Sequence, residues 1–410
     1  MAPAAPASLA VIGAGVAGCA LLAQLGRLGF RGPMSLWETG RGAGGRAGSR
    51  RSRSDGLLVI DHGAPLLNIT TTPAPALLDP LLEGGWIQPW VGPVAMLEGE
   101  SRLNIGRPDA LGMGSLFHGA GGMDQLSQGL LQLAGEAPIE HHYGTLVRFL
   151  ERPPDGPWRL LAADGTLLGE ADWLVLTGTL LAHPRSRLIL GWDEVPLARV
   201  AARLADLQLD HVLACLAGIR FEARTNLLLV FDPQQAEVWR ALPFALVNFD
   251  AAAQQRWSLR RLTMQGLADG RCAVVAHSSA AFAADHLDVV GSRSAVARLL
   301  PFPLDDSREE RVIALLRDAV HQCLSPWLSG LDLHSASAQL MRWGAAFPVA
   351  PGLPTELMLC RSSHLGFCGD FVAGPGFGRI EGALRSAELL ADQLQQLLSA
   401  SGAGSSGTSG

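Results

Sequence analysis

The chain has 410 residues, and its 32 basic residues are all arginine, which with 38 acidic residues gives a formal net charge of −6. The absence of lysine excludes a Schiff-base mechanism, a Walker-type phosphate-binding lysine and a lysine general base. The single tyrosine, Tyr143, excludes mechanisms that need a pair of tyrosines, and the mildly acidic balance argues against nucleic acid or an anionic membrane surface as a partner. The apolar fraction of 48% and the length predict a globular protein of about two or three domains.

The pattern of apolar and turn-forming residues predicts the elements in chain order. The predicted strands cover residues 9–12, 34–38, 145–151, 158–162, 173–177, 212–221, 244–249, 272–277 and 365–369. The predicted helices cover residues 16–28, 123–133, 281–287, 306–324 and 380–398, and a loop rich in glycine and arginine runs from residue 39 to about residue 55. Residues 1–7 and 399–410 are rich in small and polar residues, which predicts flexible termini.

Cysteine usage and the first apolar stretch bear on the compartment. Six cysteines are scattered without a C-x-x-C pair, which argues against a disulfide framework or a metal site and is typical of a reducing compartment. Residues 8–26 carry no charge and resemble a membrane span or a signal sequence in length. No positive region precedes them, however, and three glycines stand inside them at functional spacing. We therefore expect a strand, a turn and a helix, in a cytoplasmic protein without a stable membrane span.

Residues 13–18 read GAGVAG, a G-x-G-x-x-G motif between a predicted strand and a predicted helix. Gly13 allows the tight turn, Gly15 lets the backbone approach a pyrophosphate, and Gly18 lets the helix pack closely with its positive N-terminus on the phosphates. Glu38 ends the next predicted strand, 20 residues after Gly18, where its carboxylate is placed to accept hydrogen bonds from ribose hydroxyls. The two features together predict a dinucleotide site.

A second glycine loop follows Glu38, and residues 41–46 read RGAGGR. A simple NAD-binding Rossmann domain does not need this loop, and its GGR is similar to the motif of large two-domain flavoproteins that bind FAD in an extended form. The arginines of residues 46–53 also suit a basic localisation or nucleic-acid patch, but the position of the loop after Glu38 favours the cofactor. The predicted cofactor-binding residues of this loop are Arg41, Gly44, Gly45 and Arg46.

A third glycine-rich segment lies near the C-terminus, where residues 366–370 read GFCGD and residues 374–383 read GPGFGRIEGA. A strand that ends in Gly-Asp presents a carboxylate to ribityl or phosphate-adjacent hydroxyls, and the following glycines let the backbone pass close to a flat ring. The helix that follows points its positive N-terminus at that ring, where it would stabilise an anionic reduced flavin. The predicted contacts of this segment are Gly369, Asp370, Gly378, Arg379 and Ile380.

Taken in order, these motifs resemble the renalase-like branch of the FAD-dependent amine oxidase superfamily. Further matching pieces are residues 61–65 (DHGAP), 118–123, 275–278 (VAHS), 342–343 and 347–348, so that the resemblance runs from about residue 9 to residue 395. It implies an α/β fold: a Rossmann-type FAD-binding domain, as in glutathione-reductase-like two-domain flavoproteins, with an inserted α+β substrate domain on a mixed or antiparallel sheet. The implied FAD-binding domain comprises residues 8–70, 115–185 and 346–398, and the implied substrate domain comprises residues 71–114 and 186–345.

The resemblance also implies a reaction. Characterised renalases oxidise isomeric dihydronicotinamide nucleotides by hydride transfer to flavin N5, and reoxidation by oxygen yields hydrogen peroxide. Such a reaction mainly requires that the donor carbon be held in place and that water be excluded. The residues implied for the cofactor are His62, which is also a candidate for covalent attachment, Gly63 and Val147. The residues implied for the substrate pocket are His277, Arg342 and Trp343, for which burial in a core is the alternative.

Two other functions stay open from the sequence. One is a flavin amine oxidase or a desaturase of another small molecule, and the other is a non-catalytic nucleotide-binding relative. Amine oxidases of this superfamily commonly use a lysine near flavin N5 and an aromatic cage that often contains tyrosines, and this chain has neither in that form. The intact glycine-rich segment at residues 369–378 argues against a relative that has lost its flavin.

Overall fold

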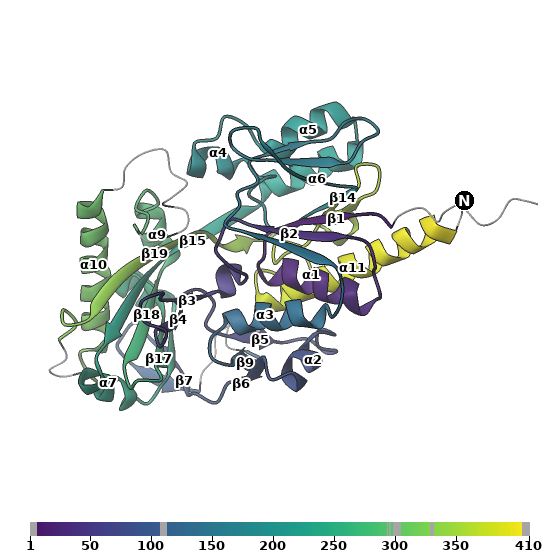
Figure 1. Ribbon diagram of the computed structural model, residues 1–410. Helices are drawn as coiled ribbons and strands as arrows, with labels where there is room; N and C mark the ends of the chain where they lie inside the picture. The colour runs from purple at the N-terminus through teal and green to yellow at the C-terminus, as the bar shows by residue number, and fades with distance from the viewer. Residues whose placement is uncertain are drawn as a thin grey trace, which may run out of the picture.

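The computed structural model describes residues 6–106, 113–292, 294, 297, 305–328 and 332–403, with backbone only for residues 399–403. A six-stranded, mainly parallel sheet and a seven-stranded, mainly antiparallel sheet organise this part of the chain (Figure 1). Within these ranges, every helix is too short or too polar to cross a membrane.

The parallel sheet contains the two strands predicted nearest the N-terminus. In order across the sheet, its strands are β10 (Ile139–Tyr143), β2 (Met34–Glu38), β1 (Leu9–Ile12), β14 (Trp173–Leu176), β21 (Leu365–Phe367) and β20 (Leu359–Cys360). Neighbouring strands run parallel except for β20 and β21. The central strands β1 and β14 are almost fully buried, because both faces of the sheet are covered, and this is why they read as continuous apolar runs.

Three helices lie together on one face of the parallel sheet, below it in Figure 1. They are α1 (Val16–Arg27), α3 (Asp124–Leu133) and α11 (Ile380–Ala403). The helix α1 contacts both of the others, and most of its residues are buried as a result. The last helix continues through residue 403, so that its backbone enters the stretch predicted to be a flexible tail.

The opposite face carries a small antiparallel sheet and three helices, above the parallel sheet in Figure 1. The strands are β11 (Phe149–Glu151), β12 (Trp158–Leu161) and β13 (Leu167–Ala171), and the helices are α4 (Arg185–Leu190), α5 (Pro196–Leu204) and α6 (Leu207–Gly218). The prediction of a strand over residues 212–221 was therefore wrong for most of its length. Asp206 caps α6 through the N–H groups of Gln208 and Leu209, and the buried side chains of Leu209, Val212 and Leu216 repeat at helical spacing.

The second sheet is built around two long strands that lie side by side. Its order is β19 (Ser337–Val349), β15 (Arg220–Phe231), β18 (Cys272–Ser278), β17 (Leu259–Gly266), β16 (Leu246–Phe249), β7 (Val94–Leu97) and β8 (Leu103–Ile105). The pair β16–β7 is parallel and the other pairs are antiparallel. One face packs on helices α7 (Pro233–Arg240), α8 (Ala251–Trp257), α9 (Ala280–Asp285) and α10 (Asp306–Leu324).

The other face of the second sheet meets a hairpin from the N-terminal part of the chain. Strands β3 (Ser49–Arg51) and β4 (Val59–Asp61) form this hairpin inside and just after the stretch predicted as a loop. Its residue Ile60 packs against Leu228, Val275 and Met341 of the sheet. The amide side chain of Gln265 also exchanges two hydrogen bonds with the backbone of Asp61, at 2.8 and 3.0 Å. The hairpin therefore attaches the part of the chain that contains the parallel sheet, called the nucleotide half below, to the second sheet.

The two largest hydrophobic cores of the described residues divide the chain differently from the predicted domains. The segment with β5 (Leu67–Ile69), α2 (Leu78–Glu83), β6 (Ile87–Pro89) and β9 (Ser115–Gly119) packs into the core of the parallel sheet, and so do α5 and α6. Strands β7, β8 and β15 to β19 form the second sheet. Parts of both segments predicted for the substrate domain thus pack against the parallel sheet. The remaining described strands of these two segments belong to the second sheet.

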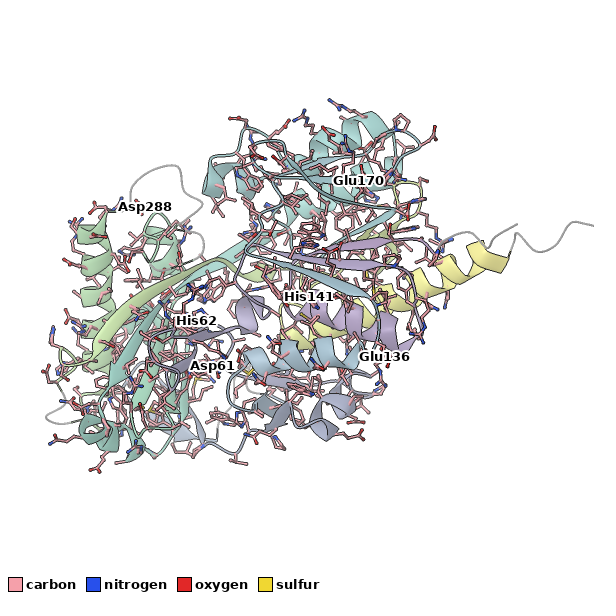
Figure 2. All side chains as sticks on the ribbon, viewed as in Figure 1. Asp61, His62, Glu136, His141, Glu170 and Asp288 are labelled. Atoms are coloured by element: carbon pink, nitrogen blue, oxygen red, sulfur yellow. The ribbon has the colours of Figure 1, made fainter. Side chains whose placement is uncertain are left out.

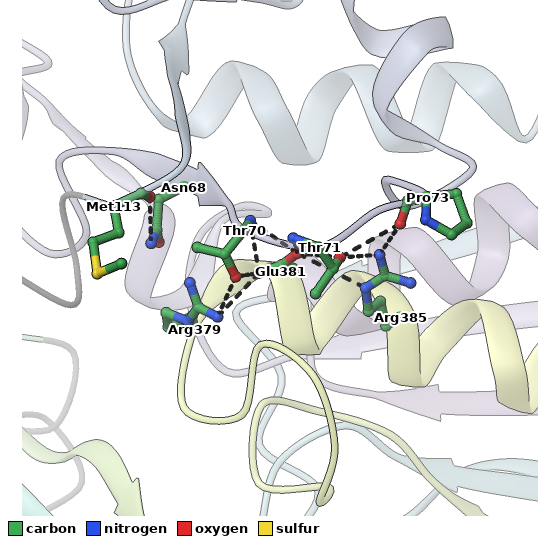
Figure 3. Close-up of polar contacts among 8 residues, drawn as sticks. All are labelled: Asn68, Thr70, Thr71, Pro73, Met113, Arg379, Glu381 and Arg385. Atoms are coloured by element: carbon green, nitrogen blue, oxygen red, sulfur yellow. Dashed lines mark hydrogen bonds and ion pairs between the residues drawn. The ribbon is translucent and has the colours of Figure 1, made fainter.

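Glu381, in the first turn of α11, is fully buried and holds the segment after β5. Its carboxylate accepts hydrogen bonds from the backbone N–H groups and the hydroxyls of Thr70 and Thr71, the shortest at 2.6 Å from Thr71 Oγ1 (Figure 3). Arg379 lies 3.1 Å from the same carboxylate and also donates to Thr70 Oγ1. Burial alone would raise the pKa of Glu381, but the hydrogen bonds from Thr71 and Thr70 outweigh burial and lower the pKa from 4.5.

Replacement of Glu381 by Gln should lower the free energy of unfolding by about 1–3 kcal/mol at neutral pH, because buried donors lose a charged acceptor. Since the folded-state pKa lies below the unfolded value, the stabilising contribution is complete above the unfolded pKa and is lost as the pH falls through the folded pKa. Urea unfolding of both proteins from pH 7 to about pH 3 should give stabilities that converge in acid.

Glu388→Gln is the control on the same helix. Burial raises the pKa of Glu388, so its replacement should not remove stability that disappears in acid. A difference between wild type and Glu381→Gln that stays constant down to about pH 3 would contradict the role of the carboxylate charge.

Candidate functional site

The first glycine turn has the close packing that its spacing predicts. Gly13 has a φ of +109°, and a Cβ there would stand 2.5 Å from Thr177 Oγ1. A Cβ on Gly18 would stand 2.0 Å from the carbonyl oxygen of Gly13, so α1 can lie this close to the turn only with glycine. Gly15 is the N-terminal cap residue of α1. The first backbone N–H groups of α1, which have no acceptor within the helix, therefore lie at the carboxyl end of β1.

Glu38 supports the same turn from the end of β2. Its carboxylate accepts hydrogen bonds from the backbone N–H groups of Ala14 at 2.9 Å and Gly40 at 2.5 Å. The segment after β10 closes over this residue, because Thr145 donates its N–H to the carbonyl oxygen of Glu38, and Val147 beyond it is buried. A carboxylate that is half-buried and held by two N–H groups retains lone pairs for the hydroxyls of a ribose.

The second glycine loop lies alongside the first. Gly44 donates its N–H to the carbonyl oxygen of Ala14 at 2.8 Å and forms an isolated parallel bridge with Gly15. Gly45 has a φ of +55°, and a Cβ there would stand 3.0 Å from the Cα of Gly15. Arg41, at the start of the loop, is exposed. The two loops thus form one backbone surface at the carboxyl ends of β1 and β2.

Arg46 joins this surface to the C-terminal segment. Its guanidinium donates two hydrogen bonds to the carboxylate of Asp370, both at 2.6 Å, and a third at 2.7 Å to the carbonyl oxygen of Ala346 in β19. Asp370 is buried, and the ion pair is bidentate, the geometry that a guanidinium favours. One side chain therefore connects the glycine loop, the end of β21 and the second sheet.

Arg185, in α4, lies within electrostatic range of this ion pair and was not predicted. Burial and the charge of Arg46 lower its pKa to about 10, and the charge of Asp370 opposes this shift. Its guanidinium donates to Thr179 Oγ1 at 3.0 Å and lies 4.8 Å from the ring centroid of Phe221, and its Nε is buried without a partner. Two guanidinium groups beside one carboxylate leave an excess positive charge, which suits an anionic group such as a pyrophosphate.

The third glycine segment turns back onto Asp370. Gly378 donates its N–H to the carbonyl oxygen of Asp370 at 2.8 Å, and Ser386 Oγ bonds both the N–H and the carbonyl of Gly369. Ile380 begins α11. The structure places Arg379 in the Glu381 network described above, where it bonds Thr70.

His62 and Gly63 bring the nucleotide half to the second sheet, where Figure 2 labels Asp61 and His62 beside β3 and β4. The carbonyl oxygen of His62 accepts a hydrogen bond from Asn226 Nδ2 at 2.8 Å and from Trp343 Nε1 at 3.4 Å. The rings of His62 and Trp343 lie edge to face with their centroids 5.4 Å apart. Asn226 is the cross-strand neighbour of His277. His62, Trp343 and His277, which are far apart in the chain, therefore share one site.

Both histidines of this site are held in the neutral form. Burial and the charge of Arg50 lower the pKa of His62 to about 4. Burial and the charges of Arg261 and Arg224 lower the pKa of His277 to about 3. The Nδ1 atom of His62 lies 2.9 Å from the carbonyl oxygen of Gly48, so in the neutral ring Nδ1 carries the proton and donates it.

Arg342 does not join Trp343 and His277. Arg224 is paired with Trp343 and Thr225 with Arg342, and adjacent residues of a strand point to opposite faces of the sheet. Arg342 donates to the carbonyl oxygen of Leu287, after α9, on the face that the helices cover. The prediction that Arg342 and Trp343 line one pocket was wrong, because the two side chains lie on opposite faces of the sheet.

Two of the four arginines of residues 46–53 are paired with carboxylates in the structure. Arg46 pairs with Asp370, and Arg51 pairs with Asp124 at the start of α3, at 2.6 Å. Because these two charges are matched by carboxylates, the cofactor interpretation of Arg46 is favoured over a nucleic-acid patch.

A surface hollow of about 420 Å³ lies elsewhere, on the small sheet β11–β13, and is lined by residues that include Glu151, Arg159 and Arg199. None of the candidate site residues described in this section lines it. Arg159 bonds Glu151 and Arg199 bonds Glu194, so these charges are already matched. The hollow therefore gives no reason to move the candidate site from the junction of the two sheets.

The chain is similar to known proteins in one domain and in overall fold. Residues 11–81 match the NAD(P)-binding Rossmann-like domain. The fold is similar to that of a candidate protoporphyrinogen oxidase from Exiguobacterium sp. 255-15, with a TM-score of 0.59 and 12% identity over 95% of this chain and 99% of that chain. An oxidoreductase from Methanosarcina mazei has a TM-score of 0.60 and 13% identity over 94% and 100% of the two chains.

A variant of putrescine oxidase redesigned in its cofactor binding has a TM-score of 0.55 and 13% identity over 95% of this chain and 99% of that chain. No curated protein matches the sequence. At such identities the likeness establishes the fold alone. The chain thus contains a Rossmann-like nucleotide-binding domain. Its overall fold is similar to the folds of two proteins named as oxidases and one named as an oxidoreductase.

Replacement of Gly18 by Ala should lower the free energy of unfolding by about 1–3 kcal/mol, because the new Cβ meets the Gly13 carbonyl oxygen and α1 must move. Gly42→Ala is the control in the neighbouring loop, since a Cβ there meets no atom within 4 Å. Denaturant unfolding measures both. Equal stabilities for the two variants would show that the close contact at Gly18 is not required.

Proposed function

We propose that this protein is an FAD-dependent oxidoreductase that oxidises a small reduced molecule. The observation that supports it most is the convergence of three glycine-rich segments on the Arg46–Asp370 ion pair, beside a wall of the second sheet that carries His277 and Trp343. Sites at the carboxyl ends of parallel strands are where α/β sheets bind dinucleotides.

The residues present fit FAD. Gly13, Gly15 and Gly18 would take the pyrophosphate on the N-terminus of α1, and Glu38 would take the hydroxyls of the adenosine ribose. Arg46, Asp370 and Arg185 would hold the remaining phosphate and ribityl oxygens. The other proposed contacts are Arg41, Gly44, Gly45, His62, Gly63, Val147, Gly369, Gly378, Arg379 and Ile380. When bound, the flavin supplies the acceptor for two electrons.

The substrate that we propose is an isomeric dihydronicotinamide nucleotide, as in the renalase-like proteins that the sequence resembles, with oxygen as the final acceptor. The side chains at the site suit a donor that needs no strong base. His277 is neutral and Trp343 offers a flat apolar ring, so their roles would be to orient the donor carbon and to exclude water. We place this reaction in the cytoplasm, without a membrane or nucleic-acid partner.

The second candidate is oxidation of an amine, which the likeness of fold to putrescine oxidase favours. Two features of this chain argue against it. The chain has no lysine, and the cations that lower the pKa of His277 are arginines, which would disfavour an ammonium group beside them. A non-catalytic nucleotide-binding protein would need neither the neutral histidines nor the tryptophan at this junction.

The purified protein should be yellow, and anaerobic mixing with isomeric dihydronicotinamide nucleotides should bleach the visible flavin bands. Primary amines and ordinary NADH should bleach them far more slowly. Stopped-flow absorbance with each donor measures the rates. A colourless protein that takes up no FAD on titration would contradict the cofactor, and bleaching by amines but not by the isomers would contradict the substrate.

The rate constant of flavin reduction should be flat between about pH 5.5 and pH 8. The folded-state pKa values of His62 and His277, about 4 and about 3, keep both rings neutral over this range. A histidine base of ordinary pKa would give a step near pH 6.5. Rapid mixing across this range measures the profile. A step near pH 6.5 that disappears in His277→Gln would show that His277 titrates as a base.

A further inference from the structure

The only tyrosine of the chain, Tyr143, ends the edge strand of the parallel sheet beside Glu38. Strands β10 and β2 run parallel in a register that pairs Tyr143 with Glu38 and His142 with Trp37. Neighbouring strands are about 4.8 Å apart, so the backbone of Tyr143 lies one strand spacing from that of the residue proposed to bind the ribose. The contacts proposed above for FAD do not include Tyr143.

Tyr143 and Glu38 point to the same face of the parallel sheet, the face that α1 covers. The rings of Trp37 and His142 stack with their centroids 3.7 Å apart, so these two residues share the opposite face. Side chains alternate along a strand, which turns Glu38 and Tyr143 toward α1. Burial, followed by Cys19 of α1 and the charge of Glu38, raises the pKa of the Tyr143 phenol. The phenol therefore lies within electrostatic range of the carboxylate and of the helix.

His141 holds the ring of Tyr143 in place on this face. The two residues stand two positions apart in β10, so their side chains share a face. Their ring centroids are 5.7 Å apart with 24° between the planes, and Tyr143 Oη lies 3.3 Å from His141 Nδ1. We call these two residues the ring pair. Because β10 is an edge strand, 36% of Tyr143 is exposed, and the ring pair presents aromatic surface beside Glu38.

The loops after the two strands are joined to each other and leave room beside them. Gly144 follows Tyr143 with a φ of +69° and donates its N–H to the carbonyl oxygen of Gly40 at 2.7 Å. Gly40 in turn donates its N–H to the carboxylate of Glu38. A Cβ on Gly144 or on Gly42 would meet no atom of the described chain within 4 Å, so there is open space beside both loops.

A nucleotide base is the group that suits this place. In an adenosine the base is attached to the ribose whose hydroxyls are proposed to bind Glu38, so it lies one sugar ring away from that carboxylate. The flavin end of the dinucleotide is proposed at Asp370, after β21, and β10 lies four strand spacings from β21, or about 19 Å. A base stacked on an aromatic side chain gains affinity, and loss of that side chain weakens binding roughly 5–150-fold.

We infer that the ring pair stacks on the adenine of the bound dinucleotide, with Tyr143 in contact with the base and His141 behind it. Tyr143 then determines the specificity for the adenosine end, while Glu38 binds the ribose hydroxyls. The inference rests on the proposed function, because it extends the FAD site to its base. It implies that FMN, which has no adenosine, gains nothing from Tyr143.

Calorimetric titration of the full-length protein freed of flavin tests this with FAD, with ADP as the adenosine half and with FMN as the flavin half. Tyr143→Ala should raise the dissociation constants of FAD and ADP roughly 5–150-fold, the effect of a lost base stack. Tyr143→Phe keeps the ring, so its constants should stay within about three-fold of the wild type. FMN should bind the three proteins equally well.

His142→Ala is the matched control, because it removes the adjacent ring from the opposite face of the same strand, where that ring stacks on Trp37. It should lower the thermal stability of the protein, as Tyr143→Ala does, and leave the FAD and ADP dissociation constants within about two-fold of the wild type. Equal affinities of wild type and Tyr143→Ala for FAD and ADP would overturn the inference, and so would an equal loss of affinity in Tyr143→Ala and His142→Ala.

The single tyrosine also allows a spectroscopic test that a merely structural role would not pass. Incorporation of 3-fluorotyrosine places one fluorine probe in the chain, at Tyr143, so the fluorine spectrum should hold one resonance. ADP should shift this resonance, because an adenine ring stacked on the phenol changes its shielding, whereas FMN should leave it in place. An unchanged resonance in a sample that calorimetry shows to be saturated with ADP would contradict the contact.

Failure of this inference and failure of the proposed function give different results. If the protein binds FAD and Tyr143→Ala retains the full affinity, the inference fails and the proposed cofactor stands. If neither FAD nor FMN binds but ADP binds through Tyr143, the proposed flavin function fails and the adenine site stands. NAD is then the dinucleotide to titrate, and its dissociation constant should show the same dependence on Tyr143.

Discussion

The ion pair between Arg46 and Asp370 is the interaction on which the candidate site depends. It joins the glycine loop after β2 to the end of β21, and a third bond from Arg46 to Ala346 reaches the second sheet. Only a guanidinium supplies two parallel donors to a carboxylate and a further donor to a carbonyl oxygen. In a chain whose basic residues are all arginine, the geometry of this side chain decides how the nucleotide half and the second sheet meet.

The two faces of the second sheet carry different kinds of side chain. One face is apolar and packs on helices, so that it stabilises the fold. The other face carries Asn226, His277 and Trp343, and its histidine is neutral because burial and arginines disfavour the imidazolium form. A neutral imidazole beside an indole ring suits the proposed role of orienting a donor and excluding water better than that of a strong base.

The sequence predicted correctly those helices and strands whose apolar spacing and end signals lie within a few residues of one another. The strands Leu9–Ile12 and Met34–Glu38 and the helix Asp306–Leu324 have the predicted bounds. The prediction failed at residues 212–218, where alternating and helical apolar patterns are hard to distinguish and the cap at Asp206 decided for a helix. Arg185 gave no signal, because it belongs to no motif, and its importance comes from its position beside Arg46 and Asp370. Asn226 and Arg261 were missed for the same reason.

The sequence by itself determined the nucleotide-binding half, because glycine spacing and the carboxylate of Glu38 act over a single turn, strand or loop. The family resemblance of the sequence also predicted His277 and Trp343 as candidate site residues. Only the tertiary structure decided that Trp343 faces His62 while Arg342 faces the helices, since strand register sets which side chain points to which face. Strand pairing likewise places His277 beside Asn226 of one neighbouring strand and Arg261 of the other, and only the folded sheet brings these strands together.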